Sequence, residues 1–243
     1  MPRLPTLAGL KREFSRAADP KRARVSAWFF KTGPGEYGEG DKFLGLSVPQ
    51  QRLLARKYSH LSLEDIEQLL RSSIHEHRLT ALLILVGQYE AGDAATRKKI
   101  FDFYLEHTAN INNWDLVDSS APYIVGEHLV ARNRKVLYRL AKSSDLWERR
   151  IAMVATSAFI RRADLKDAFA IAFLLLADKN DLIHKATGWM LRETGKRDAA
   201  ALRQFLRRHR ARMPRTALRY AIERFPQSER RRWLARPSSR TRD

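Results

Sequence analysis

The fold of this chain is decided by stretches such as residues 62–72, which read Ser-Leu-Glu-Asp-Ile-Glu-Gln-Leu-Leu-Arg-Ser. Its apolar side chains at Leu63, Ile66 and Leu70 recur every three or four positions, which places them on one face of a helix. Ser62, followed by a leucine and two acids, has the composition of a helix N-cap and first turn. The stretch therefore predicts a helix over 63–72.

The same spacing recurs along almost the whole chain, and strictly alternating β-branched runs are missing. It predicts short helices joined by polar turns, over 6–17, 21–31, 49–57, 63–72, 76–90, 94–107, 113–130, 134–143, 146–161, 165–177, 182–194, 198–209, 214–224 and 228–235. We therefore predict an all-α fold, organised as a right-handed solenoid-like array of HEAT-like antiparallel helix pairs. A globin-like or ordinary multi-helix domain is the alternative.

We predict a single helical domain over residues 1–236, with N-terminal helices in 1–31, a glycine-rich loop in 32–48 and the helical array in 49–236. Residues 237–243 are predicted to be a disordered basic tail. The loop holds four of the eleven glycines within eight positions, without the spacing of a dinucleotide or phosphate-binding loop. It also contains three acids, which disfavour phosphate. We predict an ordered linker whose glycines adopt positive φ.

The charge composition indicates a polyanionic partner, with a membrane surface as the second possibility. The 243 residues include 46 Lys+Arg against 27 Asp+Glu, a net charge of +19. Residues 1–31 carry +6 and residues 203–243 carry +11, whereas 32–202 carries only +2.

Cysteine is absent, which excludes disulfides, thiolate metal sites and cysteine nucleophiles and fits a reducing cytoplasm. No apolar run reaches the length of a membrane span, and we expect no membrane role and no secretion signal.

One polar stretch at the start of a predicted helix combines an indole with carboxylates. Trp114 and Asp118 are four positions apart and share a face, so the carboxylate lies one turn below the indole. Asp115, in the first turn, is explained by the helix dipole. The alternative is that Asp118 pairs with an arginine and Trp114 belongs to the core. The stretch in full is Asn112-Asn113-Trp114-Asp115-Leu116-Val117-Asp118.

Two further stretches place tryptophan beside basic residues. The first is Trp147-Glu148-Arg149-Arg150, which also fits an ordinary first turn whose tryptophan packs inward. The second is Ile183-His184-Lys185-Ala186-Thr187-Gly188-Trp189-Met190-Leu191-Arg192-Glu193. In it, Lys185, Trp189 and Arg192 share one face, apart from the apolar stripe. Gly188 allows another surface to approach closely.

At these residues the chain resembles the DNA alkylation repair family, the AlkD-like DNA glycosylases built from HEAT-like repeats. The motifs are Trp-Asp-x-Val-Asp, Trp-x-x-Arg and Lys-Ala-x-Gly-Trp-x-Leu-Arg-Glu, in that order, and Phe43-Leu44-Gly45-Leu46 adds to them. The resemblance covers residues from about 22 to 225. It implies a concave DNA-binding face and removal of N3- and N7-alkylated purines from duplex DNA, leaving an abasic site without a metal, another cofactor or lyase activity.

The resemblance also implies a role for individual positions. The catalytic aspartate falls on Asp118, and the two tryptophans that contact the lesion fall on Trp114 and Trp189. The family often has a tyrosine in its N-terminal helix; here the matching position is Phe29, so a hydroxyl contact to DNA is missing. The phosphate-binding positions are Arg150, its neighbour Arg149, Lys185 and Arg192.

We therefore expect a monomeric, monofunctional DNA glycosylase of base excision repair, located in the cytoplasm, at the nucleoid of a prokaryotic cell. Its partner is expected to be duplex DNA that contains alkylated purines. Two alternatives come from other classes of protein. The first is a HEAT-like protein that binds nucleic acid without cleaving a bond, and the second is a helical scaffold for protein interactions.

Overall fold

The structure is a computed structural model that describes residues 5–235, and it confirms the all-α prediction. Within these residues the only extended pairing is an isolated bridge between Lys42 and Ile74. The predicted basic tail, 237–243, lies outside the described residues. None of the described helices has the length and hydropathy needed to cross a membrane.

The chain divides into two compact units, residues 1–132 and 133–243. A single continuous HEAT-like array therefore stays a prediction.

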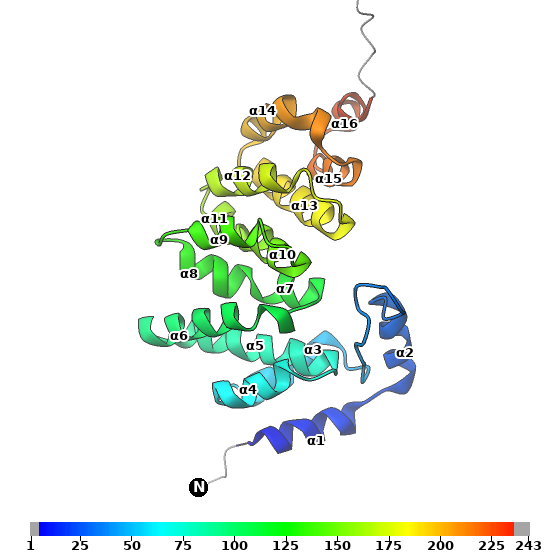
Figure 1. Ribbon diagram of the computed structural model, residues 1–243, viewed down its shortest axis with the longest axis vertical. Coiled ribbons are helices and arrows are strands. Elements are labelled where there is room, and N and C mark those ends of the chain that lie inside the picture. The colour runs from blue at the N-terminus through cyan, green and yellow to red at the C-terminus, as the bar shows by residue number, and fades with distance from the viewer. Residues whose placement is uncertain (1–4, 236–243) are drawn as a thin grey trace, which may run out of the picture. The chain divides into compact units, whose positions relative to one another are not determined.

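The first unit is built around α5, His75–Ala91 (Figure 1). This helix contacts α3, α4, α6 and α7, and most of its residues are buried, including every residue from His75 to Leu82. The other helices are α1 Leu7–Ala17, α2 Pro20–Phe29, α3 Val48–Lys57, α4 Leu63–Leu70, α6 Ala94–Glu106, α7 Trp114–Ser120 and α8 Glu127–Leu129. The N-cap predicted at Ser62 is confirmed, since its hydroxyl accepts a hydrogen bond from the Asp65 N–H.

The helix predicted over 113–130 is wrong as a continuous α-helix. It ends as α7 at Ser120 and passes through a π-helical turn, Pro122–Gly126, before the short α8. Pro122 has no N–H and cannot continue the hydrogen-bond ladder, and the Gly126 N–H instead reaches back five residues to the carbonyl of Ala121. The catalytic-site candidate Asp118 therefore lies on a helix of only two turns.

The second unit is built around α13, Asp181–Arg197, which contacts α10, α12, α14 and α15. The N-cap of α13 is Asn180, whose side chain accepts a hydrogen bond from the Leu182 N–H. The other helices of the second unit are α9 Lys135–Leu140, α10 Leu146–Ala155, α11 Ser157–Ile160, α12 Lys166–Leu175, α14 Ala199–His209, α15 Arg215–Ala221 and α16 Gln227–Leu234. The predicted helix 146–161 is thus two helices.

The close approach predicted at Gly188 is present. A Cβ atom at this position would lie 2.5 Å from both the Ala217 carbonyl oxygen and the Tyr220 Cβ, so α13 and α15 pack with no room for a side chain. The positive φ predicted for the glycines of the glycine-rich loop is present at two of the four and absent at Gly33 and Gly38. Gly35 and Gly40 have φ of 74° and 86°, and the Glu36 and Glu39 carboxylates accept hydrogen bonds from loop N–H groups.

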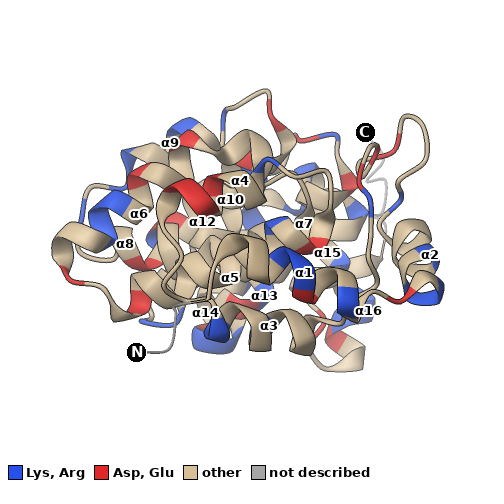
Figure 2. Cartoon of the chain, turned by 90° about the horizontal axis from the view of Figure 1, so that it is seen from below, with Lys and Arg blue, Asp and Glu red and all other residues tan. Residues whose placement is uncertain are grey.

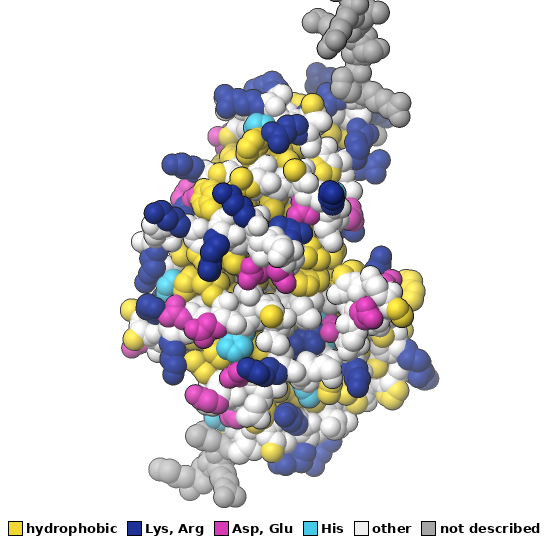
Figure 3. Space-filling view, in the orientation of Figure 1, with side chains coloured by type: hydrophobic (Ala, Val, Ile, Leu, Met, Phe, Trp, Pro, Cys, Tyr) yellow, Lys and Arg dark blue, Asp and Glu magenta, His cyan; other side chains and the backbone are white. Residues whose placement is uncertain are grey.

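Basic residues are dense at both ends of the described chain. Lys and Arg positions recur along α1 and α2 (Figure 2). In the second unit, Lys and Arg side chains gather over α14 (Figure 3). The exposed side chains on this helix and the turn after it include Arg207, Arg208 and Arg212. The charge concentrated at the two ends of the sequence is therefore presented at the surface.

Candidate active site

Helix α7 carries the motif Trp114 to Asp118 and begins at a buried cap. Asn113 is fully buried, and its side-chain oxygen accepts a hydrogen bond from the Trp114 N–H at 2.8 Å. The Asp115 carboxylate accepts a hydrogen bond from the Leu116 N–H at 2.9 Å. The start of α7 is therefore fixed by side chains that satisfy its first N–H groups.

Asp115 also belongs to a buried chain of charged groups. Nε2 of His75 lies 2.8 Å from Oδ2 of Asp115, and Nδ1 lies 3.1 Å from Oδ2 of Asp41. Arg78 donates to the other oxygen of Asp41 at 2.7 Å. This charged cluster, Arg78–Asp41–His75–Asp115, joins the glycine-rich loop, α5 and α7. The prediction that Asp115 acts only through the helix dipole was therefore incomplete.

The geometry of the charged cluster determines its protonation. Only 2% of the His75 surface is exposed, and this burial opposes a charge on the ring. The hydrogen bonds and negative charges of Asp115 and Asp41 outweigh the burial and raise the pKa of His75 to about 9. The pKa of Asp41 is lowered, because the contacts with His75 and Arg78 outweigh the effect of its burial. Near pH 7 the imidazolium thus links two carboxylates.

An aromatic stack links Trp114 to the His75 ring of the charged cluster through Phe30. The Trp114 ring lies parallel to Phe30 with centroids 5.3 Å apart, and Phe30 stacks in turn on Phe43 at 5.1 Å. The ring of Phe29 meets Trp114 edge-on at 5.9 Å. Phe29 is 54% exposed and its neighbour Trp28 is 81% exposed. The first unit therefore presents aromatic surface to solvent beside the half-buried Trp114.

Asp118 lies one turn after Trp114 and is half-buried. Burial raises the pKa of the Tyr104 phenol, and the negative charge of Asp118 raises it further. The Tyr104 hydroxyl forms a hydrogen bond with the Ser120 hydroxyl at 2.9 Å. The structure thus brings Trp114, Asp118 and Phe29 together in the first unit.

The other predicted site residues lie in the second unit. Trp189 is half-buried on α13. Arg150 is 5% exposed and donates to the Leu182 carbonyl at 2.6 Å, at the start of α13. The Nε atom of Arg149 lies 2.6 Å from Oδ2 of Asp178. Trp147 packs inward, as the alternative interpretation of its motif expected.

Lys185 and Arg192 also have internal partners. Nζ of Lys185 lies 2.8 Å from Oδ2 of Asp181, and both side chains are substantially exposed. Arg192 is paired with Glu223 and with Glu193. The cations predicted to bind phosphate are thus engaged with groups of the protein itself, and their phosphate contacts stay predictions.

The charged cluster was not predicted from the sequence. The feature that indicates it is the run His75-Glu76-His77-Arg78, in which four consecutive polar residues begin an apolar helix and are all buried. The Glu76 carboxylate accepts hydrogen bonds from the N–H groups of Leu44 and Gly45 at 2.7 to 3.0 Å. Buried polar groups need partners, so such a run indicates a segment that docks there.

Comparisons with known proteins agree with this architecture. The sequence model of the family described as DNA alkylation repair enzyme matches residues 10–225. A solved structure titled as a predicted DNA alkylation repair enzyme from Enterococcus faecalis superposes with a TM-score of 0.66 and 16% sequence identity. The superposition covers 86% of this chain and 97% of the other, which shows a common fold. No curated protein sequence matches the chain.

Within residues 5–235, no group of three or more His, Asp or Glu side chains is arranged to hold a metal ion.

Proposed function

Because the chain belongs to the DNA alkylation repair enzyme family, we propose that it is a DNA glycosylase that hydrolyses the N-glycosidic bond of positively charged N3- and N7-alkylated purines in duplex DNA. The observation that carries this proposal is the half-buried carboxylate of Asp118, one helical turn from Trp114 and next to exposed aromatic surface. An aromatic face stabilises the cationic base, and a carboxylate stabilises the cationic sugar that forms as the base leaves.

The chemistry follows from the charge of the substrate. When the bond between C1′ and the purine nitrogen breaks, its electron pair moves to the purine and neutralises it, so the base departs without protonation. The sugar that remains has oxocarbenium character. Asp118 stabilises that positive charge and orients the water whose oxygen attacks C1′, and the water proton passes to the carboxylate or to solvent. The products are the free base and an abasic site.

Selection of the lesion is assigned to the aromatic side chains. A desolvated cation on a tryptophan face gains up to about 2 kcal/mol, which a neutral purine does not. Trp114 and Phe29 supply this surface in the first unit, and Trp189 supplies it in the second. Phe29 contributes only its ring, because it has no hydroxyl group.

The phosphate contacts are assigned to Lys185, Arg192, Arg149 and Arg150. Each must exchange or share an internal partner to bind a phosphate. The exchange costs least at Lys185, since an exposed ion pair between residues four apart contributes little to stability.

We further propose that the enzyme acts as a monomer on DNA in the cytoplasm, at the nucleoid of a prokaryotic cell, and requires no cofactor.

The test is release of 7-methylguanine and 3-methyladenine from methylated duplex DNA by wild type and Asp118→Asn. Loss of electrostatic stabilisation in the transition state is expected to slow release by about 100- to 1000-fold while duplex affinity is retained. Glu106→Gln removes one negative charge from an exposed position of the same unit and serves as the control. Unchanged release by Asp118→Asn contradicts the catalytic role, and no release by wild type favours a non-catalytic nucleic-acid-binding protein.

A further inference from the structure

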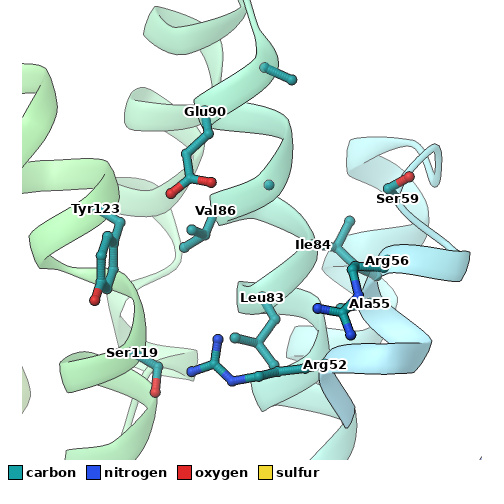
Figure 4. Close-up of a pocket in the computed structure, with 12 residues that line it drawn as sticks. Arg52, Ala55, Arg56, Ser59, Leu83, Ile84, Val86, Glu90, Ser119 and Tyr123 are labelled. Carbon is teal, nitrogen blue, oxygen red and sulfur yellow. The ribbon is translucent and has the colours of Figure 1, made fainter. Parts of the chain in front are cut away.

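A concave site lies in the first unit, over α5. It has a volume of about 550 Å³ and is bounded by α3 on one side and by α7 and the π-helical turn on the other (Figure 4). Its floor is formed by Leu83, Val86 and Gly87. Ser119, the residue after Asp118, forms part of one wall, so the pocket adjoins the helix of the proposed catalytic site.

The floor contains a glycine that packing does not explain. Gly87 lies inside the 17-residue helix α5 and is exposed. A Cβ atom built at this position would meet no heavy atom within 4 Å. Glycine is unfavourable in a helix interior compared with alanine, so its presence here needs another reason. The direct consequence of the missing side chain is an open pocket floor.

One end of the pocket is cationic. Arg52 and Arg56 lie one turn apart on α3 and are exposed, and neither side chain has a hydrogen-bond or ion-pair partner among residues 5–235. The guanidinium group of Arg52 extends across the pocket toward Ser119 (Figure 4). The Arg52 guanidinium group beside a hydroxyl, with the Arg56 guanidinium group at the α3 wall of the same pocket, suits a phosphate, to which arginine donates in a bidentate manner.

The opposite end of the pocket is acidic. The Glu90 carboxylate points into the pocket there and has no described hydrogen-bond or ion-pair partner of its own (Figure 4). Tyr123, 40% exposed, offers an aromatic ring at the wall between the two ends. A ligand that fills the pocket therefore carries an anion at one end and N–H donors on a flat, stackable body at the other. A simple anion or a uniformly acidic peptide is disfavoured by Glu90.

We propose that this pocket binds one unpaired nucleotide of a DNA strand, with its phosphate between Arg52 and Arg56 and its base over Gly87, against Tyr123. Glu90 accepts a hydrogen bond from an amino group of the base, as acidic side chains do from the cytosine amine. The choice of DNA over other phosphate-bearing ligands rests on the proposed function. The pocket is a binding subsite separate from the side chains of Trp114 and Asp118.

The experiment is titration of the full chain with deoxycytidine 5′-monophosphate, followed by calorimetry and by the NMR shift of the Gly87 amide. Gly87→Leu fills the open floor without a backbone clash and is expected to weaken binding at least tenfold. Arg52→Gln combined with Arg56→Gln is expected to have an effect of the same size, since each lost charged hydrogen bond costs about a factor of ten or more. Arg12→Gln combined with Arg16→Gln, at two exposed positions of α1, is the charge-matched control for the arginine pair.

Three results overturn the proposal: no binding of the nucleotide, unchanged binding by folded Gly87→Leu, or equal affinity for inorganic phosphate and the nucleotide. Helical circular dichroism verifies folding, and the arginine pair decides the question if Gly87→Leu is unfolded. Asp118→Asn is expected to bind the nucleotide as wild type does. Base release without nucleotide binding therefore refutes the pocket alone, and nucleotide binding without base release refutes only the glycosylase.

Discussion

Removal of His75 is expected to change how the stability of the first unit depends on pH. In the native state its imidazole is held between Asp41 and Asp115, which raises its pKa to about 9, against about 6.5 in an unfolded chain. A difference of that size corresponds to about 3 kcal/mol in favour of the folded, protonated form. Asp41, Asp115 and Arg78 are the charged groups that face the ring.

The sign of the effect follows from proton binding. Below pH 6.5 both states are protonated at His75 and the stabilisation is fully present. Above pH 6.5 only the folded state keeps the proton, so the stabilisation falls as pH rises and is lost as pH passes through about 9. The free energy of unfolding of wild type minus that of His75→Gln is therefore expected to fall by about 3 kcal/mol between pH 6 and 9.5.

Urea denaturation at several pH values, followed by tryptophan fluorescence, measures this difference, because Trp114 stacks on Phe30, whose ring centroid lies 4.8 Å from that of His75. His60→Gln replaces a histidine outside the carboxylate pair and is the matched control. A difference between wild type and His75→Gln that stays constant from pH 6 to 9.5 refutes the reasoning. It would mean that His75 is not a protonated link between the two carboxylates in the folded protein.

Two further substitutions test the packing of each unit. Gly188→Ala places a methyl group 2.5 Å from the Ala217 carbonyl oxygen and is expected to destabilise the second unit by about 1–3 kcal/mol in urea denaturation; wild-type stability would show that α13 and α15 separate easily. Glu76→Gln removes the carboxylate that accepts the Leu44 and Gly45 N–H groups and is expected to cost about 1–3 kcal/mol, with faster hydrogen exchange at those amides; unchanged exchange would contradict this role.

Much of the secondary structure could be predicted because helix formation depends on residues close in sequence. The three-to-four spacing located nearly every helix, and Ser62 was identified as a cap from its own chemistry. The errors came at local exceptions. Pro122 broke the predicted helix 113–130, and the helix predicted over 146–161 is interrupted at Thr156, whose hydroxyl donates to the Met153 carbonyl at 2.6 Å.

The candidate site was predictable only in part. The motif placed Trp114 and Asp118 on one helical face, which the short helix α7 preserves. Its support could not be predicted: Asp41 meets His75 across 34 positions, and Phe30 meets Trp114 across 84 positions of the chain. No local pattern specifies such a pairing.

The helical fold, the absence of cysteine chemistry, the positive charge at the two ends and membership of a DNA repair family all follow from the amino-acid sequence. Which charged side chains have partners within the protein is visible only in the folded chain. Arg149 and Arg150 are engaged within the second unit, whereas Arg52 and Arg56 face an open pocket. The physical reason is that periodicity fixes which residues share a face, while burial and long-range packing decide whether a charge meets a partner or solvent.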